Sequence, residues 1–292
     1  MSVNTQRKPP WLKVRVAEGA GYRSVRRTVT GQKLHTVCQE ARCPNVGECW
    51  GAGTATFLLL GDVCTRGCGF CAVTRGNRPG DVDDTEPRRV SEAVRSMQLR
   101  YAVLTSVTRD DLPDGGAGVF ASTLHELAGL PTPPRTEVLV PDYAPAPLQA
   151  VLEAAPDVLA HNLEVVERLT PTLRHPRFSY RRSLEVLRQA AASRWRGVVK
   201  SSLLLGLGER DEEIRAAMED LLAVGVEVLV LGQYLPPSRR HAPVTEYVPP
   251  ERFDAWAEEG RLLGFGYVAA GPLVRTSYRA AEAYLAQRRN AG

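Results

Sequence analysis

Short apolar runs that alternate with longer amphipathic stretches are the feature that most constrains the fold of this 292-residue chain. The apolar runs are typical of buried strands, and the stretches between them have the spacing of helices. The predicted strands are Thr54–Leu60, Tyr101–Val107, Thr136–Val140, Asp157–His161, Gly197–Leu205 and Glu227–Leu231. The predicted helices are Val90–Leu99, Gly118–Leu130, Pro147–Ala155, Ser183–Ser193 and Asp211–Val224. Strand–helix alternation indicates parallel strands joined by crossover helices.

About six such units fit between residues 54 and 235, whereas a closed barrel needs about eight. We therefore predict an α/β fold, a partial (β/α)6 open TIM-like barrel with N- and C-terminal extensions. A doubly wound open sheet is the alternative. The expected domains are an N-terminal extension (1–50), the partial barrel (51–248) and a C-terminal extension (249–292) with a helix near Phe253–Leu263. Residues 1–50 show no long periodic element, so short helices in irregular structure are expected there.

Charge and hydropathy exclude several classes of partner. The formal net charge is +4, and no block of like charges suggests a nucleic-acid-binding tail. No apolar run is long enough for a transmembrane helix, so no membrane contact is expected. The first residues carry no apolar core of a secretory signal, which predicts a cytoplasmic protein. In that compartment the six cysteines should be metal ligands or catalytic groups rather than disulfides.

Three of these cysteines follow the first predicted strand. Cys64, Cys68 and Cys71, here the second triplet, have C-x3-C-x2-C spacing in a position typical of active-site loops. Three thiolates hold three irons of a cubane cluster and leave the fourth iron open to nitrogen and oxygen donors. Gly67 and Gly69 allow close wrapping and are expected to offer N–H groups to the sulfides. A zinc site or inert thiols are the alternatives, but zinc usually takes four ligands and no fourth Cys or His lies nearby in the sequence.

The spacing of the second triplet resembles the signature of the radical S-adenosylmethionine (SAM) superfamily, which has an aromatic residue before its last cysteine. Phe70 fills that place. The resemblance implies a 4Fe–4S cluster and SAM as cofactors, with Phe70 beside SAM.

Cys38, Cys43 and Cys49, here the first triplet, have C-x4-C-x5-C spacing, which next to the second triplet indicates a second cluster. The surrounding sequence resembles the lipoyl synthase family from about Lys8 to Ala280. The motifs that carry this resemblance are T-V-C-Q-E-A-R-C-P-N-V-G-E-C-W (36–50), G-T-A-T-F (53–57), L-T-S-V-T-R-D-D-L (104–112), H-N-L-E (161–164), G-L-G-E (206–209), G-Q-Y-L-P-P-S (232–238) and G-P-L-V-R-T-S-Y-R-A (271–280).

The resemblance implies a sulfurtransferase that inserts two sulfur atoms, at carbons six and eight, into an octanoyl chain attached to a lysine of a carrier protein, giving lipoyl-lysine. Two SAM molecules generate the radicals that remove the unactivated hydrogens, and an auxiliary 4Fe–4S cluster on the first triplet is the sulfur donor. The implied partners are octanoylated lipoyl domains of 2-oxoacid dehydrogenase E2 subunits, the glycine cleavage H protein, and an electron donor such as ferredoxin or flavodoxin.

The resemblance also implies a serine as fourth ligand of the auxiliary cluster. Ser277 retains this serine, whereas Thr276 departs from the two serines common in the family. An oxygen ligand on a thiophilic iron would be labile. Without the resemblance, Ser277 would be read as an ordinary surface or capping hydroxyl.

Four further residues are candidates for SAM binding, and no catalytic residue is expected beyond the clusters. Asn162 and Glu164 close a predicted strand with His161 and suit ribose hydroxyls, or form a polar cluster satisfied by backbone. Lys200 lies in an apolar run, so it needs a carboxylate partner, either in the protein or the methionyl carboxylate of SAM. Arg174 is the rival for that carboxylate.

Three other residues have simpler interpretations. Ser202 stands where many relatives have glycine. Asp110 and Asp111 are more readily a cap or partners of an arginine such as Arg109 than acid/base groups.

Two other functions compete with this one. A methylthiotransferase would also have two clusters, but often carries a nucleic-acid-binding tail. A non-catalytic electron carrier would need neither a large barrel nor an open iron.

Overall fold

An eight-stranded sheet forms the centre of the protein in a computed structural model, which describes residues 7–13, 20–40, 43, 45–77, 81–277 and 283–286. The strand order is β1-β2-β5-β6-β7-β8-β9-β10; β1 is antiparallel to β2, and every other neighbouring pair is parallel. The strands of this sheet are β1 (His35–Thr36), β2 (Thr54–Leu59), β5 (Tyr101–Ser106), β6 (Arg135–Leu139), β7 (Val158–Ala160), β8 (Val198–Leu205), β9 (Val228–Gln233) and β10 (Tyr267–Gly271). A separate parallel pair joins β3 (Val63–Cys64) to β4 (Thr74–Arg75).

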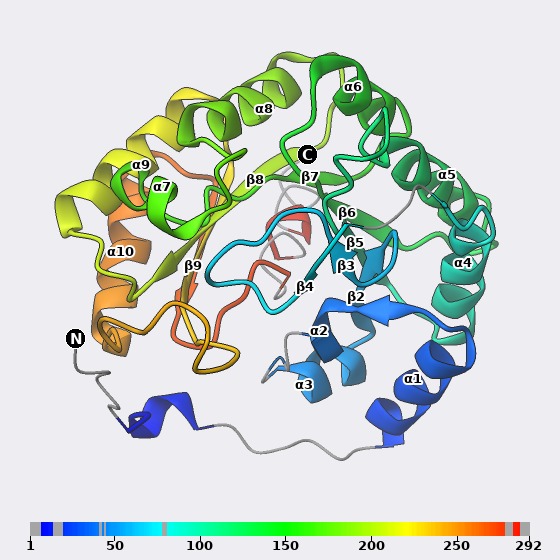
Figure 1. The fold of residues 1–292 in the computed structure, drawn as a ribbon, viewed down its shortest axis with the longest axis horizontal. Coiled ribbons are helices and arrows are strands. Elements are labelled where there is room, and N and C mark those ends of the chain that lie inside the picture. The colour runs from blue at the N-terminus through cyan, green and yellow to red at the C-terminus, as the bar shows by residue number, and fades with distance from the viewer. Residues whose placement is uncertain are drawn as a thin grey trace.

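Helices follow the strands and surround the outer face of the sheet in an arc (Figure 1). The α-helices are α1 (Ala20–Gly31), α2 (Val37–Glu40), α3 (Val46–Gly51), α4 (Glu86–Ser96), α5 (Ala117–Ala128), α6 (Pro145–Glu153), α7 (Thr170–Leu173), α8 (Tyr180–Ala192), α9 (Asp211–Ala223) and α10 (Pro250–Leu263), with 3-10 helices at Pro10–Leu12 and Glu167–Leu169. Within the described residues, no helix is both long and apolar enough to cross a membrane.

The open partial barrel and all six predicted strands are confirmed. The sheet begins at β1 and ends at β10, and α2 and α3 lie between these two edges (Figure 1). Two features differ from the prediction. Strand β10 adds a further parallel strand beside β9, and α1 is a helix of 12 residues where only short helices are expected. The buried side chains of α1 include Val25 and Val29, which are four positions apart. Two apolar residues are too few to show a helical period in the sequence.

The main hydrophobic core lies between the sheet and its helices and includes the N-terminal elements. Val25 and Val29 of α1, and Trp50 of α3, belong to the same buried cluster as the barrel strands. A smaller cluster lines the inner face of the sheet, with Tyr101, Val103, Val158, Val198, Val228 and Val230. The N-terminal segment is thus packed onto the barrel rather than attached to it by a linker.

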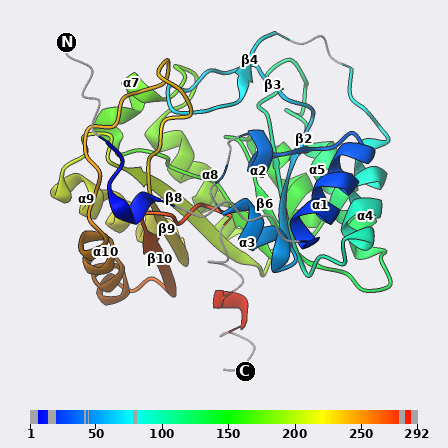
Figure 2. The same cartoon turned by 90° about the horizontal axis from the view of Figure 1, so that it is seen from below.

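The C-terminal segment fills the inside of the sheet at the amino ends of the strands. Val274, Tyr284 and Leu285 pack against the inner cluster, and Tyr284 Oη donates to Glu227 Oε2 at 3.0 Å. Figure 2 shows the helical piece at 283–286 on the side opposite the β3–β4 loop. The carboxyl ends of the strands therefore form the mouth of the barrel. Tyr278, Arg279 and Ala280 of the last family motif lie outside the described residues.

Candidate active site at the mouth of the barrel

The loop of the second triplet crosses the mouth of the barrel, where it lies over the middle of the ring of strands (Figure 1). It leaves β2 through Leu60 and Gly61, whose φ angles are 67° and 86°. Two successive left-handed residues turn the chain sharply off the sheet. The Leu60 N–H is held by Glu86 Oε2 at 2.9 Å, which fixes the turn.

The sulfur atoms of this triplet lie in an environment that fits bound iron. The Thr108 N–H lies 3.3 Å from Cys64 Sγ, and the His175 N–H lies 3.4 Å from Cys68 Sγ. Burial raises the pKa of Cys71 to about 12, and the neighbouring Cys68 adds to the rise. Such a thiol stays protonated at neutral pH unless a metal binds its thiolate. Three half-buried thiols, two of which have a backbone N–H close to sulfur, suit the thiolate ligands of an iron–sulfur cluster.

One detail of the loop corrects the sequence-based expectation. Gly69 does not offer its N–H to sulfur, because this N–H donates to the Leu173 carbonyl at 2.7 Å. A Cβ at Gly67 would approach Arg75 Cδ to 2.6 Å, so a larger residue there requires the exposed Arg75 side chain to move. In the described part of the chain, no three Cys, His, Asp or Glu side chains converge on a point that could hold a single metal ion.

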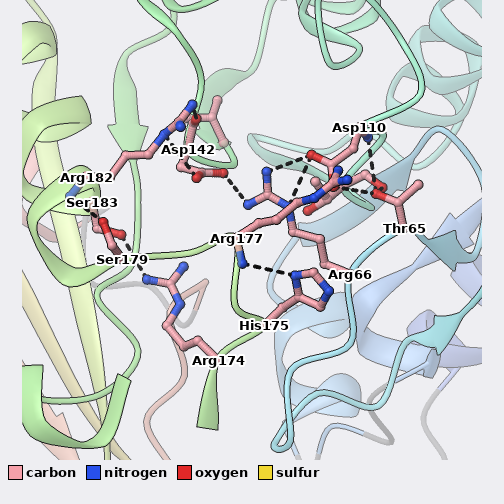
Figure 3. A network of polar contacts seen from close by, with 12 residues as sticks. Thr65, Arg66, Asp110, Asp142, Arg174, His175, Arg177, Ser179, Arg182 and Ser183 are labelled. Atoms are coloured by element: carbon pink, nitrogen blue, oxygen red, sulfur yellow. Dashed lines mark hydrogen bonds and ion pairs between the residues drawn. The ribbon is translucent and has the colours of Figure 1, made fainter. Parts of the chain in front are cut away.

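Arg66, inside the second triplet, ties the loop to the ends of two strands (Figure 3). Its Nη2 lies 2.7 Å from Asp110 Oδ1, after β5, and its Nη1 lies 2.6 Å from Asp142 Oδ1, after β6. The guanidinium also stacks on Phe178, 4.2 Å from the ring centroid. Hydrogen bonds from Arg66 hold the pKa of Asp110 at about 2, so this carboxylate is ionised.

Sequence reasoning missed the role of Arg66, although an arginine within the triplet and the nearby acidic pair were visible. The interpretation of Asp110 and Asp111 as arginine partners is confirmed. Asp111 pairs with Arg109 at 2.7 Å and Asp110 pairs with Arg66.

Asn162 and Glu164 lie side by side at the mouth, as their position after β7 predicts. Asn162 Nδ2 donates to Glu164 Oε1 at 3.0 Å, whereas Asn162 Oδ1 is buried and has no hydrogen-bond partner among the described residues. Glu164 has a φ of 67°, unusual for a residue with a side chain and typical of strained functional sites. Its pKa is raised by burial. An orphaned amide oxygen beside a carboxylate can accept two adjacent hydroxyl groups, as a ribose presents them.

Arg174 approaches the second triplet from the other side. Its Nη1 donates to Ser183 Oγ at 2.8 Å (Figure 3). Its guanidinium stacks on Phe178, 4.1 Å from the ring centroid. The Nε atom is buried without a partner in the described residues. Burial raises the pKa of Cys68, and the charge of the nearby Arg174 guanidinium opposes this rise. A buried, unpaired N–H of this kind suits a carboxylate.

Two polar groups deeper in the barrel are satisfied by the protein itself. Lys200 Nζ lies 2.7 Å from Glu137 Oε1, and both side chains are 1% exposed. Of the two partners considered for Lys200, the structure supplies the protein carboxylate. His161 bonds to the Val140 carbonyl and Ser183 Oγ, at 2.8 and 2.9 Å, and burial lowers its pKa to about 3. Neither side chain is available to a ligand at the mouth.

Phe70 provides an apolar wall. It packs against Val165, Leu207 and Tyr234, which follow three neighbouring strands of the sheet. The next segment closes over the loop, since the Ala242 N–H donates to the Gly69 carbonyl at 2.8 Å. The aromatic ring thus lines the side of the mouth that faces β8 and β9.

The first triplet lies between the two edges of the open sheet. Cys38 on α2 and Cys49 on α3 are each 8% exposed, and the Cys43 N–H donates to the Cys38 carbonyl at 3.0 Å. Burial raises the pKa of Cys38, and Cys43 raises it further. Two short helices therefore hold Cys38 and Cys49, and Cys43 lies in the connection between these helices. The raised pKa of Cys38 again fits a thiolate that is stabilised by a metal.

The segment that contains Ser277 lies against the first triplet. Asn45 Nδ2 donates to the Leu273 carbonyl at 2.6 Å, between residues 228 positions apart. Burial lowers the pKa of Arg275, and the charge of Cys43 opposes this effect. Ser277 is partly buried, two residues after this arginine. The structure thus brings the C-terminal segment to the site where the sequence predicts a fourth ligand.

Family comparisons agree with this geometry. The model of the radical SAM superfamily matches residues 58–221, and the model of the N-terminal domain of lipoyl synthase matches residues 2–43. Lipoyl synthase of Anaeromyxobacter sp. (strain Fw109-5) is 55% identical over 96% of both chains. Lipoyl synthase of Thermus thermophilus is 52% identical over 95% of this chain and 87% of its own. Lipoyl synthase 2, chloroplastic, of Zea mays is 49% identical over 96% of this chain and 80% of its own.

Solved structures share the fold at low identity. The FeFe-hydrogenase maturase HydG from Carboxydothermus hydrogenoformans superposes with a TM-score of 0.56 at 13% identity, covering 72% of this chain and 51% of its own. Methylornithine synthase superposes with a TM-score of 0.52 at 14% identity, covering 76% of this chain and 66% of its own. These likenesses support the open barrel and carry no further functional argument.

Proposed function

The chain belongs to the lipoyl synthase family within the radical SAM superfamily, and from this premise we propose that its two cysteine triplets divide sulfur insertion between them. Family membership makes the protein a sulfur-inserting enzyme that uses SAM and a 4Fe–4S cluster. The family also accounts for both triplets, which a methylthiotransferase or an electron carrier would not require in this layout.

The second triplet is the proposed site of radical generation. Cys64, Cys68 and Cys71 would hold the cluster whose open iron binds SAM. The observation that carries this proposal is the pair of orphaned buried atoms beside the loop, Asn162 Oδ1 and Arg174 Nε.

In this site Asn162 and Glu164 would bind the ribose, Arg174 the methionyl carboxylate, and Phe70 the apolar part of the cofactor. Lys200 is left out of the SAM site because Glu137 already binds its ammonium.

The first triplet is the proposed sulfur-donating site. Cys38, Cys43 and Cys49 would hold an auxiliary 4Fe–4S cluster, with Ser277 as fourth ligand. The proximity of residues 273–275 to this triplet supports the assignment. A serine oxygen is a hard ligand on a thiophilic iron and is readily released, which suits a cluster that gives up sulfur.

When bound, SAM and the clusters supply the radical and sulfur chemistry that acts on carbons six and eight of the octanoyl chain. The protein supplies positions. Arg66 fixes the loop over the mouth, and the C-terminal segment contacts both Asn45, beside the first triplet, and Asn162, at the mouth. Packed side chains at the amino ends of the strands close the other end, so reacting groups enter from the mouth.

The proposed partners follow from this chemistry. The substrates would be octanoyl-lysine groups on lipoyl domains of 2-oxoacid dehydrogenase E2 subunits and on the glycine cleavage H protein. A ferredoxin or flavodoxin would supply electrons. We place this reaction in the cytoplasm, where the six thiols stay reduced.

Three variants test the division of labour in an anaerobic assay with an octanoylated carrier domain. Cys68→Ala should abolish 5′-deoxyadenosine release and sulfur insertion together. Cys38→Ala and Ser277→Ala should keep 5′-deoxyadenosine release but give no mass increase from sulfur. Full lipoylation by Cys38→Ala or Ser277→Ala would refute the assignment of the corresponding residue to the auxiliary site.

A further inference from the structure

The residue before Ser277 makes side-chain contacts with the mouth of the barrel. Thr276 Oγ1 accepts a hydrogen bond from Asn162 Nδ2 at 3.2 Å and lies 2.9 Å from Ser202 Oγ. Asn162 follows β7 and Ser202 lies on β8, so one hydroxyl joins the C-terminal segment to two adjacent strands. We call these three side chains the 162–202–276 junction.

The Asn162 amide is shared between this junction and the proposed ribose site. One N–H of Nδ2 is directed to Glu164 Oε1 at 3.0 Å, and the other to Thr276. With both donors used, the plane of the amide is fixed, and with it the direction of the buried, orphaned Oδ1. Moving Thr276 therefore changes where Oδ1 points.

The backbone on the amino side of Thr276 is held separately. Asn45 bonds to the Leu273 carbonyl, and a Cβ at Gly232 would overlap the carbonyl oxygen of Val274, so the backbones of β9 and the segment touch. Thr276 differs from these residues because its side chain is bonded to Asn162 and Ser202 at the mouth of the barrel. Displacement at Ser277 is thus passed to Thr276 more readily than to residues 273–274.

We propose that Thr276 is a positioning residue that couples SAM binding to the ligation state of Ser277. The inference rests on the proposed function of Ser277. When Ser277 is bound at the auxiliary site, the junction holds Asn162 Oδ1 in the direction that SAM needs. When Ser277 is released, the constraint on the amide is lost and SAM binds more weakly. Because coupling between sites is reciprocal, SAM also stabilises the ligated position of Ser277.

The two departures from the family pattern that the sequence shows, Ser202 and Thr276, contact each other in this junction. The hydroxyl of Ser202 offers Thr276 a second partner, which a glycine at position 202 would not. Ser202 therefore adds a second contact that holds the Thr276 hydroxyl in this chain.

The test is a SAM titration of the reduced holoprotein, followed by the change in the EPR signal of the second-triplet cluster. Thr276→Val keeps the branched shape and removes the hydroxyl; it should weaken SAM binding about tenfold, as expected for a buried amide N–H left without its acceptor. Thr276→Ser keeps the hydroxyl and should bind SAM within about twofold of wild type. Thr123→Val, which removes a buried hydroxyl bonded to the Val119 carbonyl on α5, is the matched control and should have no effect.

A double-variant comparison tests the coupling itself. Ser277→Ala should weaken SAM binding several-fold in the wild-type background and by less than about twofold when Thr276 is already valine. Equal effects in both backgrounds, or wild-type SAM affinity in Thr276→Val, would overturn the proposal. Mössbauer spectra of the same samples distinguish failure of the coupling from failure of the ligand assignment. An auxiliary cluster whose spectrum is unchanged by Ser277→Ala would refute Ser277 as a ligand.

Discussion

The ion pair between Lys200 and Glu137 gives a sharp prediction about stability. Both side chains are 1% exposed, and Glu137 also accepts a hydrogen bond from Tyr101 Oη at 2.9 Å. Replacing Lys200 by Met removes the cation and leaves a buried carboxylate with only the tyrosine. Breaking a buried pair in this way costs about 3–5 kcal/mol. For a chain of this size we expect the Tm to fall by roughly 5–8 °C.

The assay is anaerobic thermal unfolding, with SAM affinity measured on the same samples. Lys200→Met should lower the Tm and leave SAM affinity near wild type at a temperature where the variant is folded. Lys13→Met, at an exposed lysine, is the control and should leave the Tm unchanged. The double variant with Glu137→Gln should recover about half of the lost stability, because the uncompensated charge is gone. An unchanged Tm with tenfold weaker SAM binding would refute the structural role and return Lys200 to the SAM site.

Three further predictions follow from other contacts. The pKa of His161 falls from 6.5 to about 3 on folding. Below pH 6.5 the unfolded chain gains a proton that the folded chain excludes, so the free energy of unfolding decreases as pH falls, by about 2 kcal/mol at pH 5. His161→Gln should flatten this part of a Tm–pH profile. Gly232→Ala should displace the Val274 backbone and reduce sulfur insertion more than 5′-deoxyadenosine release, whereas Gly31→Ala, with no atom within 4 Å of its new Cβ, should change neither. Arg66→Lys should lower SAM cleavage about tenfold by losing the forked contacts of the guanidinium while the iron content is kept; wild-type cleavage would contradict the anchoring role.

The parts of the fold that the sequence predicts are those with local signals. The six strands appear as apolar runs because both faces of a parallel sheet are covered. Strand β10 has no such signal: Tyr267–Gly271 is short, is rich in small residues and is half-buried for most of its length, since it lies at an edge of the sheet. It becomes a strand through pairing with β9, which is a contact between distant segments.

The same distinction holds for the candidate site. The cysteine spacings are local, so both triplets are visible in the sequence. Glu137, the partner of Lys200, lies 63 positions away in the sequence, and Asp142 lies 76 positions after Arg66. No periodicity reports such pairs, because they are set by the order of strands in the sheet. Ser277 needed the family resemblance, since a lone serine carries no spacing signal.

The contact between Asn45 and Leu273 also sets the order of events during synthesis. These residues are separated by 228 positions. At the usual speed of translation, of about 5–20 residues per second, roughly 10–45 s pass between the appearance of the first triplet and that of the segment that closes over it. During that interval the cysteines exist without the serine, the arginine and the final strand. Iron loaded early at the proposed auxiliary site would meet a half-built pocket open to water, so the proposed centre would be completed only after the C-terminal segment has been made.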